Sequence, residues 1–177
     1  MAQEMTVSTF TVVHVLISLL GIVSGLVVMY GLLTANRLER WTTLFLVSTA
    51  ATNITGFLFP FKGVTPGIVI GVLSLILLAV AVIGRYALNL NGAWRPIYIV
   101  AASVALYFNI FVFVVQSFEK IPQLRSLAPT QKEPPFEVAQ LLVLLIFVIV
   151  TGFALKRFRP DLTFTRKPNS SRSKRAA

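Results

Sequence analysis

The sequence predicts an all-α membrane protein, a polytopic bundle of five transmembrane helices. Of its 177 residues, 56% are hydrophobic and only 12% are charged, whereas soluble domains contain about a quarter charged residues. The apolar residues form five long blocks with no acidic residue in their interiors. All nine prolines lie at block edges or in the connections, where they do not interrupt helices.

Each block is long enough to cross a hydrocarbon core of roughly 30 Å, which requires about 20 apolar residues of helix. Strands of a membrane β-barrel are about 10 residues long and alternate in polarity, and these blocks do neither. The first block is too long for a secretory signal and no Lys or Arg precedes it, so we interpret it as a retained helix. The expected spans are about 10–33, 41–59, 66–88, 96–118 and 136–155.

One connection is much longer than the others and separates the fourth and fifth blocks. Within it, Ile121, Leu124 and Leu127 recur at helical spacing, which predicts a short interfacial helix that ends by Pro129. Two prolines, Pro134 and Pro135, then restart the chain into the last span. We interpret this connection as a covering loop, with a functional loop as the alternative because long loops in compact domains often carry function.

The distribution of basic residues predicts the orientation in a plasma (bacterial inner) membrane. Cytoplasmic loops collect Lys and Arg. Twelve basic residues follow the first, third and fifth spans, on the side of the membrane where the C-terminus lies, and four lie on the other side. We therefore expect the N-terminus outside and the C-terminus in the cytoplasm. Arg85 lies near the inner boundary, where we expect its side chain to snorkel to water.

We divide the chain into a membrane domain, residues 1–156, and a basic tail, residues 157–177. The tail is rich in Ser and basic residues and poor in apolar ones, so it is expected to be disordered and to contact anionic lipid. A nucleic-acid partner is not expected, because no nucleic-acid-binding fold surrounds the tail. There is no cysteine, which excludes disulfides, thiolate metal sites and redox CxxC motifs.

A small set of polar residues lies inside the spans, all in the predicted outer half of the membrane. Polar groups are costly in hydrocarbon and face the interior of a bundle. We therefore expect them to form one polar cluster, which is the candidate ligand site. Its members are His14, Asn53, Asn109 and Gln140, with Gln116 at the outer rim.

Two GxxxG patterns predict where helices approach each other closely. Gly21 and Gly25 share a face with His14 in the first span, and Gly67 and Gly71 lie in the third. Small residues at this spacing let membrane helices come near. The pattern is informative about packing and not about chemistry.

The cluster allows three interpretations. The polar residues can simply hold the bundle together by hydrogen bonds between helices. They can line a pocket for a small ligand or a quinone, since apolar walls with a few polar groups describe most ligand sites. The third interpretation is haem binding through His14. Because His14 is the only histidine, haem ligation by two histidines would require a homodimer.

Ion pumping and hydrolysis are not expected, because no acidic residue lies deep in a span. No catalytic residue and no metal ligand set is predicted, and no cofactor is required by the sequence. We expect a small, non-enzymatic membrane protein, either an accessory subunit of a larger membrane complex or a ligand-holding bundle. The alternative is a redox protein that binds haem or quinone, across a homodimer in the case of haem.

Overall fold

The computed structural model describes residues 2–59, 63 and 65–159, and every regular element in these ranges is helical. This confirms the all-α fold class. A π-helical turn, η1, directly follows α3, and a six-residue helix, α5, lies in the long connection. The elements are α1 (Ala2–Leu33), α2 (Glu39–Gly56), α3 (Pro66–Val82), η1 (Ile83–Ala87), α4 (Trp94–Lys120), α5 (Pro122–Leu127) and α6 (Pro134–Arg157).

Four of these helices are long and apolar enough to cross a membrane, one fewer than the five predicted. They are α1 from Thr9 onward, α3 continued by η1, α4 and α6. The remaining helix, α2, has 18 residues, and seven of them are Ser, Thr or Asn. Its hydroxyl and amide side chains lower its hydropathy below that of its neighbours. The fold is thus a multi-pass membrane bundle in which α2 is the polar member.

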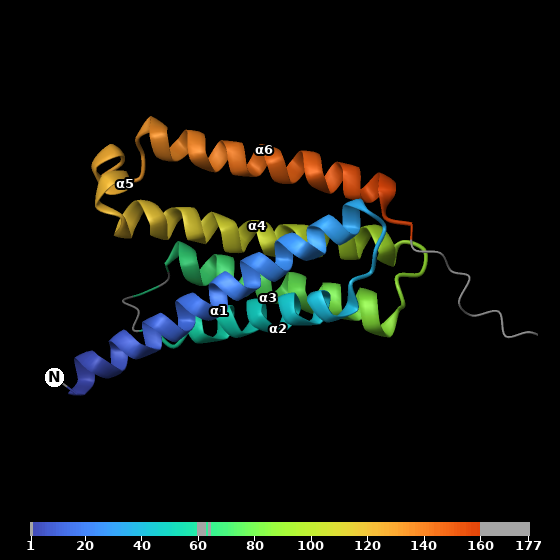
Figure 1. Ribbon diagram of the computed structural model, residues 1–177, viewed down its shortest axis with the longest axis horizontal. Coiled ribbons are helices and arrows are strands. Elements are labelled where there is room, and N and C mark those ends of the chain that lie inside the picture. The colour runs from blue at the N-terminus through green and yellow to red at the C-terminus, as the bar shows by residue number, and fades with distance from the viewer. Residues whose placement is uncertain (1, 60–62, 64, 160–177) are drawn as a thin grey trace, which may run out of the picture.

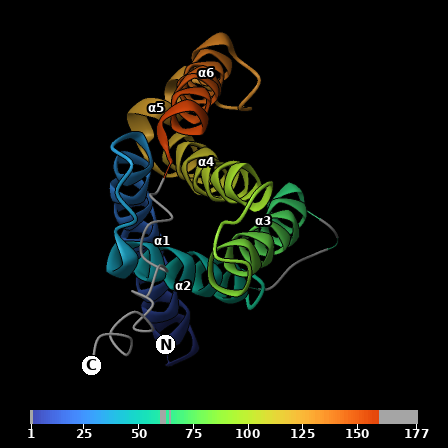
Figure 2. The ribbon, with the colours of Figure 1, turned by 90° about the vertical axis from the view of Figure 1, so that its right-hand side faces the viewer.

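Helices α1 to α4 are arranged in a ring, and α6 lies outside it. Around the ring, each helix packs against the next, and α4 closes it by packing against α1. Figure 2, which looks along the bundle, shows this ring with α6 on the far side of α4. Helix α6 contacts α4 along its length and α1 less extensively, so most of its surface faces away from the protein.

The hydrophobic core occupies only one end of the bundle. One half of the bundle contains the ends of α1 and α3 and the starts of α2 and α4, and we call it the packed end. We call the opposite half the open end. At the open end the N-terminal part of α1 diverges from α4 and α6 (Figure 1), while Phe10 and His14 keep it in contact with Phe59 after α2. The buried core residues, all at the packed end, are Val28, Met29, Leu32, Phe45, Leu46, Leu78, Ala81, Leu90, Tyr98, Ile99, Ala101, Ala102, Ala105, Leu106, Ala154 and Phe158.

The glycines of the GxxxG patterns occupy different environments. A Cβ added to Gly25 would lie 2.5 Å from Leu106 and 2.9 Å from Phe45, and one added to Gly71 would lie 2.9 Å from Phe57. At Gly21 the nearest atom, 3.2 Å away, is the Thr49 hydroxyl. Gly67 differs, because an added Cβ would meet only the Thr65 hydroxyl, at 3.7 Å.

The connection between α4 and α6 contains the short helix that the sequence predicts, over Pro122–Leu127. At the other end of α6, the helix continues through Arg157, and Phe158 is fully buried with its ring 6.5 Å from that of Tyr98. The described chain is therefore still packed where the sequence analysis begins the tail. The expected disorder of the tail concerns residues 160–177, which lie outside the described residues.

Gly25 provides a direct test of the close packing between α1, α2 and α4. We expect Gly25→Ala to destabilise the protein, because overpacking costs about 1–3 kcal/mol and exceeds the gain in helix propensity of about 1 kcal/mol. The matched control is Gly152→Ala in α6, where an added Cβ meets no atom within 4 Å. Thermal unfolding in detergent should show a lower midpoint for Gly25→Ala only. An equal midpoint for both variants would contradict this packing.

Candidate functional site

Two of the predicted cluster residues, Asn53 and Asn109, belong to one hydrogen-bond network inside the ring. The amide of Asn53 donates to the Thr49 carbonyl (2.8 Å) and to the Ser74 hydroxyl (3.1 Å). The amide of Asn109 donates to the Thr49 hydroxyl (3.0 Å). These four residues, which we call the polar layer, join α2, α3 and α4, and α1 contributes Gly21 beside Thr49. The polar residues of α2 thus bind the ring together.

The polar layer separates the packed end from the open end. Thr49 and Ser74 are buried, and Asn53 and Asn109 are half-buried. One helical turn before Thr49 lies Phe45, a buried core residue. Beyond Asn53, toward the open end, the remaining α2 side chains are exposed or half-buried. The layer therefore lies at the boundary between the buried core and the open end, and we call this boundary the floor of the open end.

His14 lies on a different side of α2 from the polar layer. Its Nδ1 is 2.8 Å from the Thr55 hydroxyl, and its ring packs edge-on against Phe59 at 5.1 Å between centroids. The Thr55 hydroxyl donates its single hydrogen to the Ala51 carbonyl (2.7 Å). When the Thr55 hydrogen is on that carbonyl, His14 donates from Nδ1 in the His14–Thr55 bond, and in this tautomer Nε2 of the neutral ring is an acceptor without a partner among the described residues.

Gln140 and Gln116 lie apart from both of these groups. The Gln140 amide donates to the Phe111 carbonyl (3.3 Å), and its buried Oε1 has no hydrogen-bond partner. Gln116 is exposed on α4. The structure thus brings Asn53 and Asn109 together, and it places His14, Gln140 and Gln116 in three other environments of the same end.

A second polar centre, which the sequence analysis missed, lies at the packed end. Arg85 in η1 is only 5% exposed. Its guanidinium forms an ion pair with Glu39 (2.9 Å) and donates to the Arg37 carbonyl (2.7 Å) and to the Tyr98 hydroxyl (3.1 Å). The expectation that Arg85 snorkels to water is therefore wrong. The protein instead supplies its partners from three neighbouring elements, and only Nε remains unpaired.

The π-helical turn explains how Arg85 comes to face the interior. A π turn has one more residue than an α turn and changes which side chains share a face. In η1, Gly84 and Arg85 are both buried, whereas Ile83 and Tyr86 on either side are exposed. The sequence signal for this centre is an arginine inside an apolar block, with an acidic residue, Glu39, at the same end of the neighbouring helix.

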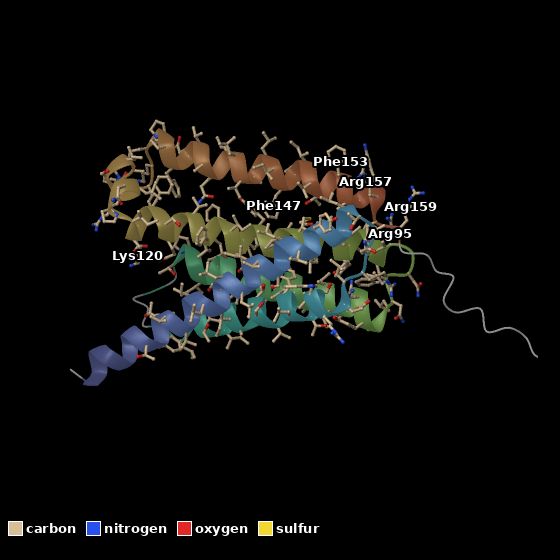
Figure 3. All side chains as sticks on the ribbon, viewed as in Figure 1. Arg95, Lys120, Phe147, Phe153, Arg157 and Arg159 are labelled. Carbon is tan, nitrogen blue, oxygen red and sulfur yellow. The ribbon has the colours of Figure 1, made fainter. Side chains whose placement is uncertain are left out.

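Arg95 makes a comparable contact at the same end of the bundle. Its guanidinium donates to the carbonyls of Leu155 (3.3 Å) and Phe158, and the last turn of a helix leaves such carbonyls unpaired. Figure 3 shows Arg95 near Arg157 and Arg159, where α6 ends. Arg95 thus caps α6 and ties its end to the start of α4.

Within residues 2–59, 63 and 65–159, no group of three or more His, Asp or Glu side chains could hold a metal ion. Comparison with protein-family models, with curated proteins and with solved structures finds no match to this chain.

The Arg85 centre is testable by a double-mutant cycle. We expect Arg85→Met to cost about 3 kcal/mol, because it removes the charge-assisted hydrogen bonds to the Tyr98 hydroxyl and to the Arg37 carbonyl and leaves the Thr42 hydroxyl as the donor to that carbonyl. Glu39→Gln should cost about 1–2 kcal/mol, because the Glu39 side chain is 57% exposed and solvent screens the pair.

The double variant should lose less stability than the sum of the two single losses, by about 1 kcal/mol. Chemical unfolding in mixed micelles measures all three values. Glu119→Gln is the control, since the Glu119–Lys120 pair is solvent-exposed and should contribute little. Strict additivity would contradict a direct Arg85–Glu39 interaction.

Proposed function

We propose that this chain is a non-enzymatic protein of the plasma (bacterial inner) membrane that holds a small ligand at its open end. The observation that carries the proposal is the polar layer, which forms the floor of a loosely packed half. In this role the protein is a ligand-holding bundle, on its own or as an accessory subunit of a larger membrane complex.

The unused hydrogen-bond acceptors of the open end support this proposal. The amide nitrogen of Asn53 faces the Thr49 carbonyl, which fixes the orientation of the group and points Oδ1 elsewhere. Among the described residues, no donor reaches this oxygen or the Nε2 of His14. An unpaired polar group in hydrocarbon costs several kcal/mol. A ligand or a water molecule that donates hydrogen bonds would remove this cost.

The side chains around the floor define the class of ligand. Phe57 lies against Gly71 on one side of Asn53. It is only half-buried, so apolar surface remains beside the Asn53 oxygen. Apolar walls with a few polar groups suit a small, mostly apolar molecule that carries a hydroxyl or amine donor.

Asn53 provides the test of ligand binding. We expect native mass spectrometry of the purified protein to detect a co-purifying small molecule. In Asn53→Leu its occupancy should fall about tenfold, as expected for the loss of one good hydrogen bond, while stability falls by about 1–2 kcal/mol. Thr52→Val is the control, because the Thr52 hydroxyl bonds only to the Ser48 carbonyl of its own helix. Absence of any such mass in the parent protein, or unchanged occupancy in Asn53→Leu, would count against the proposal.

The His14 geometry supports a second candidate, a redox protein that binds haem or quinone. A metal-binding histidine usually donates its other ring N–H to an oxygen, and the His14–Thr55 bond has this arrangement. A single chain offers one histidine, so ligation by two histidines requires a homodimer. A Soret band in the purified protein that is lost in His14→Phe would favour this alternative over the ligand at the polar layer.

The orientation of the bundle in the membrane is also part of the proposal. We expect the packed end to face the cytoplasm, because most basic residues, including Arg37, Arg40 and those after α6, lie on that side. Anionic lipid is the expected partner of the basic tail there.

A pair of fusions tests this orientation. A reporter active only in the cytoplasm should work after Ala177 and be silent when inserted at Ser126, in the connection between α4 and α6. The opposite pattern would place the open end and its polar layer in the inner leaflet.

A further inference from the structure

A cleft between the end of α4, α5 and the loop that follows α5 is separate from both polar centres. Its volume is about 500 Å³. We propose that it binds the phosphate of an anionic phospholipid at the membrane boundary. This inference does not depend on the proposed ligand at the polar layer. The residues that line it are Phe118, Glu119, Lys120, Arg125, Pro129, Thr130 and Gln131.

The rim of the cleft is held in one conformation by local hydrogen bonds. Gln131 has a left-handed backbone (φ 57°), which is uncommon outside glycine, and its side-chain amide donates to the Val115 carbonyl of α4 (3.2 Å). Ala128, at the end of α5, is fully buried. A rim anchored in this way loses little freedom when a ligand binds, which favours affinity.

Glu133, the acidic residue that follows this rim most closely in sequence, has its carboxylate hydrogen-bonded within the loop. Its carboxylate accepts hydrogen bonds from the Thr130 hydroxyl (2.8 Å) and from the backbone N–H groups of Thr130 and Lys132. Desolvation raises the pKa of the Glu133 carboxyl, but these hydrogen bonds lower it by more, so the net shift is downward. The carboxylate therefore stays charged at neutral pH and maintains the loop.

The side chains that line the cleft carry a net positive charge of one. Lys120 pairs with Glu119 at 3.1 Å, whereas Arg125 has no ion pair or side-chain hydrogen bond with any residue that the structure describes. The planar guanidinium of arginine can donate two parallel hydrogen bonds to a phosphate. Arg125 is therefore the residue that we expect to contact the anion, with Lys120 as the second cation.

The position of the cleft favours a lipid over a free anion. Lys120 ends one apolar helix and Pro134 begins another, so the cleft lies at the boundary where lipid phosphates are found. Phe118, which lines the cleft, packs its ring edge-on against that of Phe136 at 5.4 Å, and Val138 and Leu141 are exposed on α6. A phospholipid can use the cations and this apolar surface together, whereas inorganic phosphate can use only the cations.

The test uses the full chain in a neutral detergent and native mass spectrometry with three added probes. The probes are phosphatidylglycerol, phosphatidylcholine and inorganic phosphate. We expect phosphatidylglycerol to form the most abundant adduct, and Arg125→Gln to lower it about tenfold, the loss expected for a charge-assisted hydrogen bond. Arg159→Gln is the matched control, because it removes an equal charge from an exposed arginine at the packed end.

Four other results are informative. Equal losses in Arg125→Gln and Arg159→Gln would overturn the proposal, because they indicate nonspecific attraction to net charge. An unchanged adduct in Arg125→Gln would also overturn it. Equal binding of phosphatidylcholine would exclude selection for an anionic lipid. Inorganic phosphate that binds as well as the lipid, with the same loss in Arg125→Gln, would support the phosphate site and assign it to a free anion.

Discussion

The packed end of this bundle depends on one buried cation, the guanidinium of Arg85. A buried charge is tolerated only when its partners are in place, and here those partners come from the turn before α2, from α2 itself and from α4. Forming the Arg85 centre therefore fixes the positions of three elements relative to η1. Arg95 adds the end of α6 to the same region through its bonds to the Leu155 and Phe158 carbonyls. The hydrophobic core lies between these two arginines and the polar layer, which explains why it is confined to one half of the molecule.

Polar groups thus have two roles that depend on how completely they are paired. At the packed end, the Arg85 guanidinium has three partners, and the surrounding side chains are buried. At the open end, the amide nitrogen of Asn53 is paired while its oxygen is not, and one ring nitrogen of His14 has no partner among the described residues. The more complete pairing at the packed end stabilises the fold, whereas the unpaired atoms at the open end can form hydrogen bonds with a ligand. This difference in pairing is the physical basis for placing the proposed ligand at the open end and a structural role at the packed end.

Much of the fold follows from the sequence, because hydropathy and proline positions report directly on helix length and helix ends. The same signals cannot report how side chains pair. The apolar blocks predict the bounds of α2, α3 with η1, α4 and α6 to within three residues, whereas α1 begins at Ala2, eight residues before its block. The hydropathy of α2 is lower than that of the other long helices, because its Ser, Thr and Asn side chains serve hydrogen bonds. The prediction that the polar residues share one half of the molecule does not reveal that His14 and Asn53 lie on different sides of α2. The sequence does not predict the burial of Arg85, because its partners, Glu39 and Tyr98, are distant in sequence and meet it only through the π turn.

The divergence of α1 from α4 and α6 has a consequence for the membrane itself. A bundle that is tightly packed at one end and spread at the other is wedge-shaped (Figure 1), so it occupies more area in one leaflet than in the other. Lipids must compensate for this difference, and the energy of doing so depends on the curvature of the bilayer. At the spread end α1 stays in contact with α2 and the residues after it through the His14–Thr55 and Phe10–Phe59 pairs, so a change in the lateral pressure of that leaflet would act on the distance between α1 and α4.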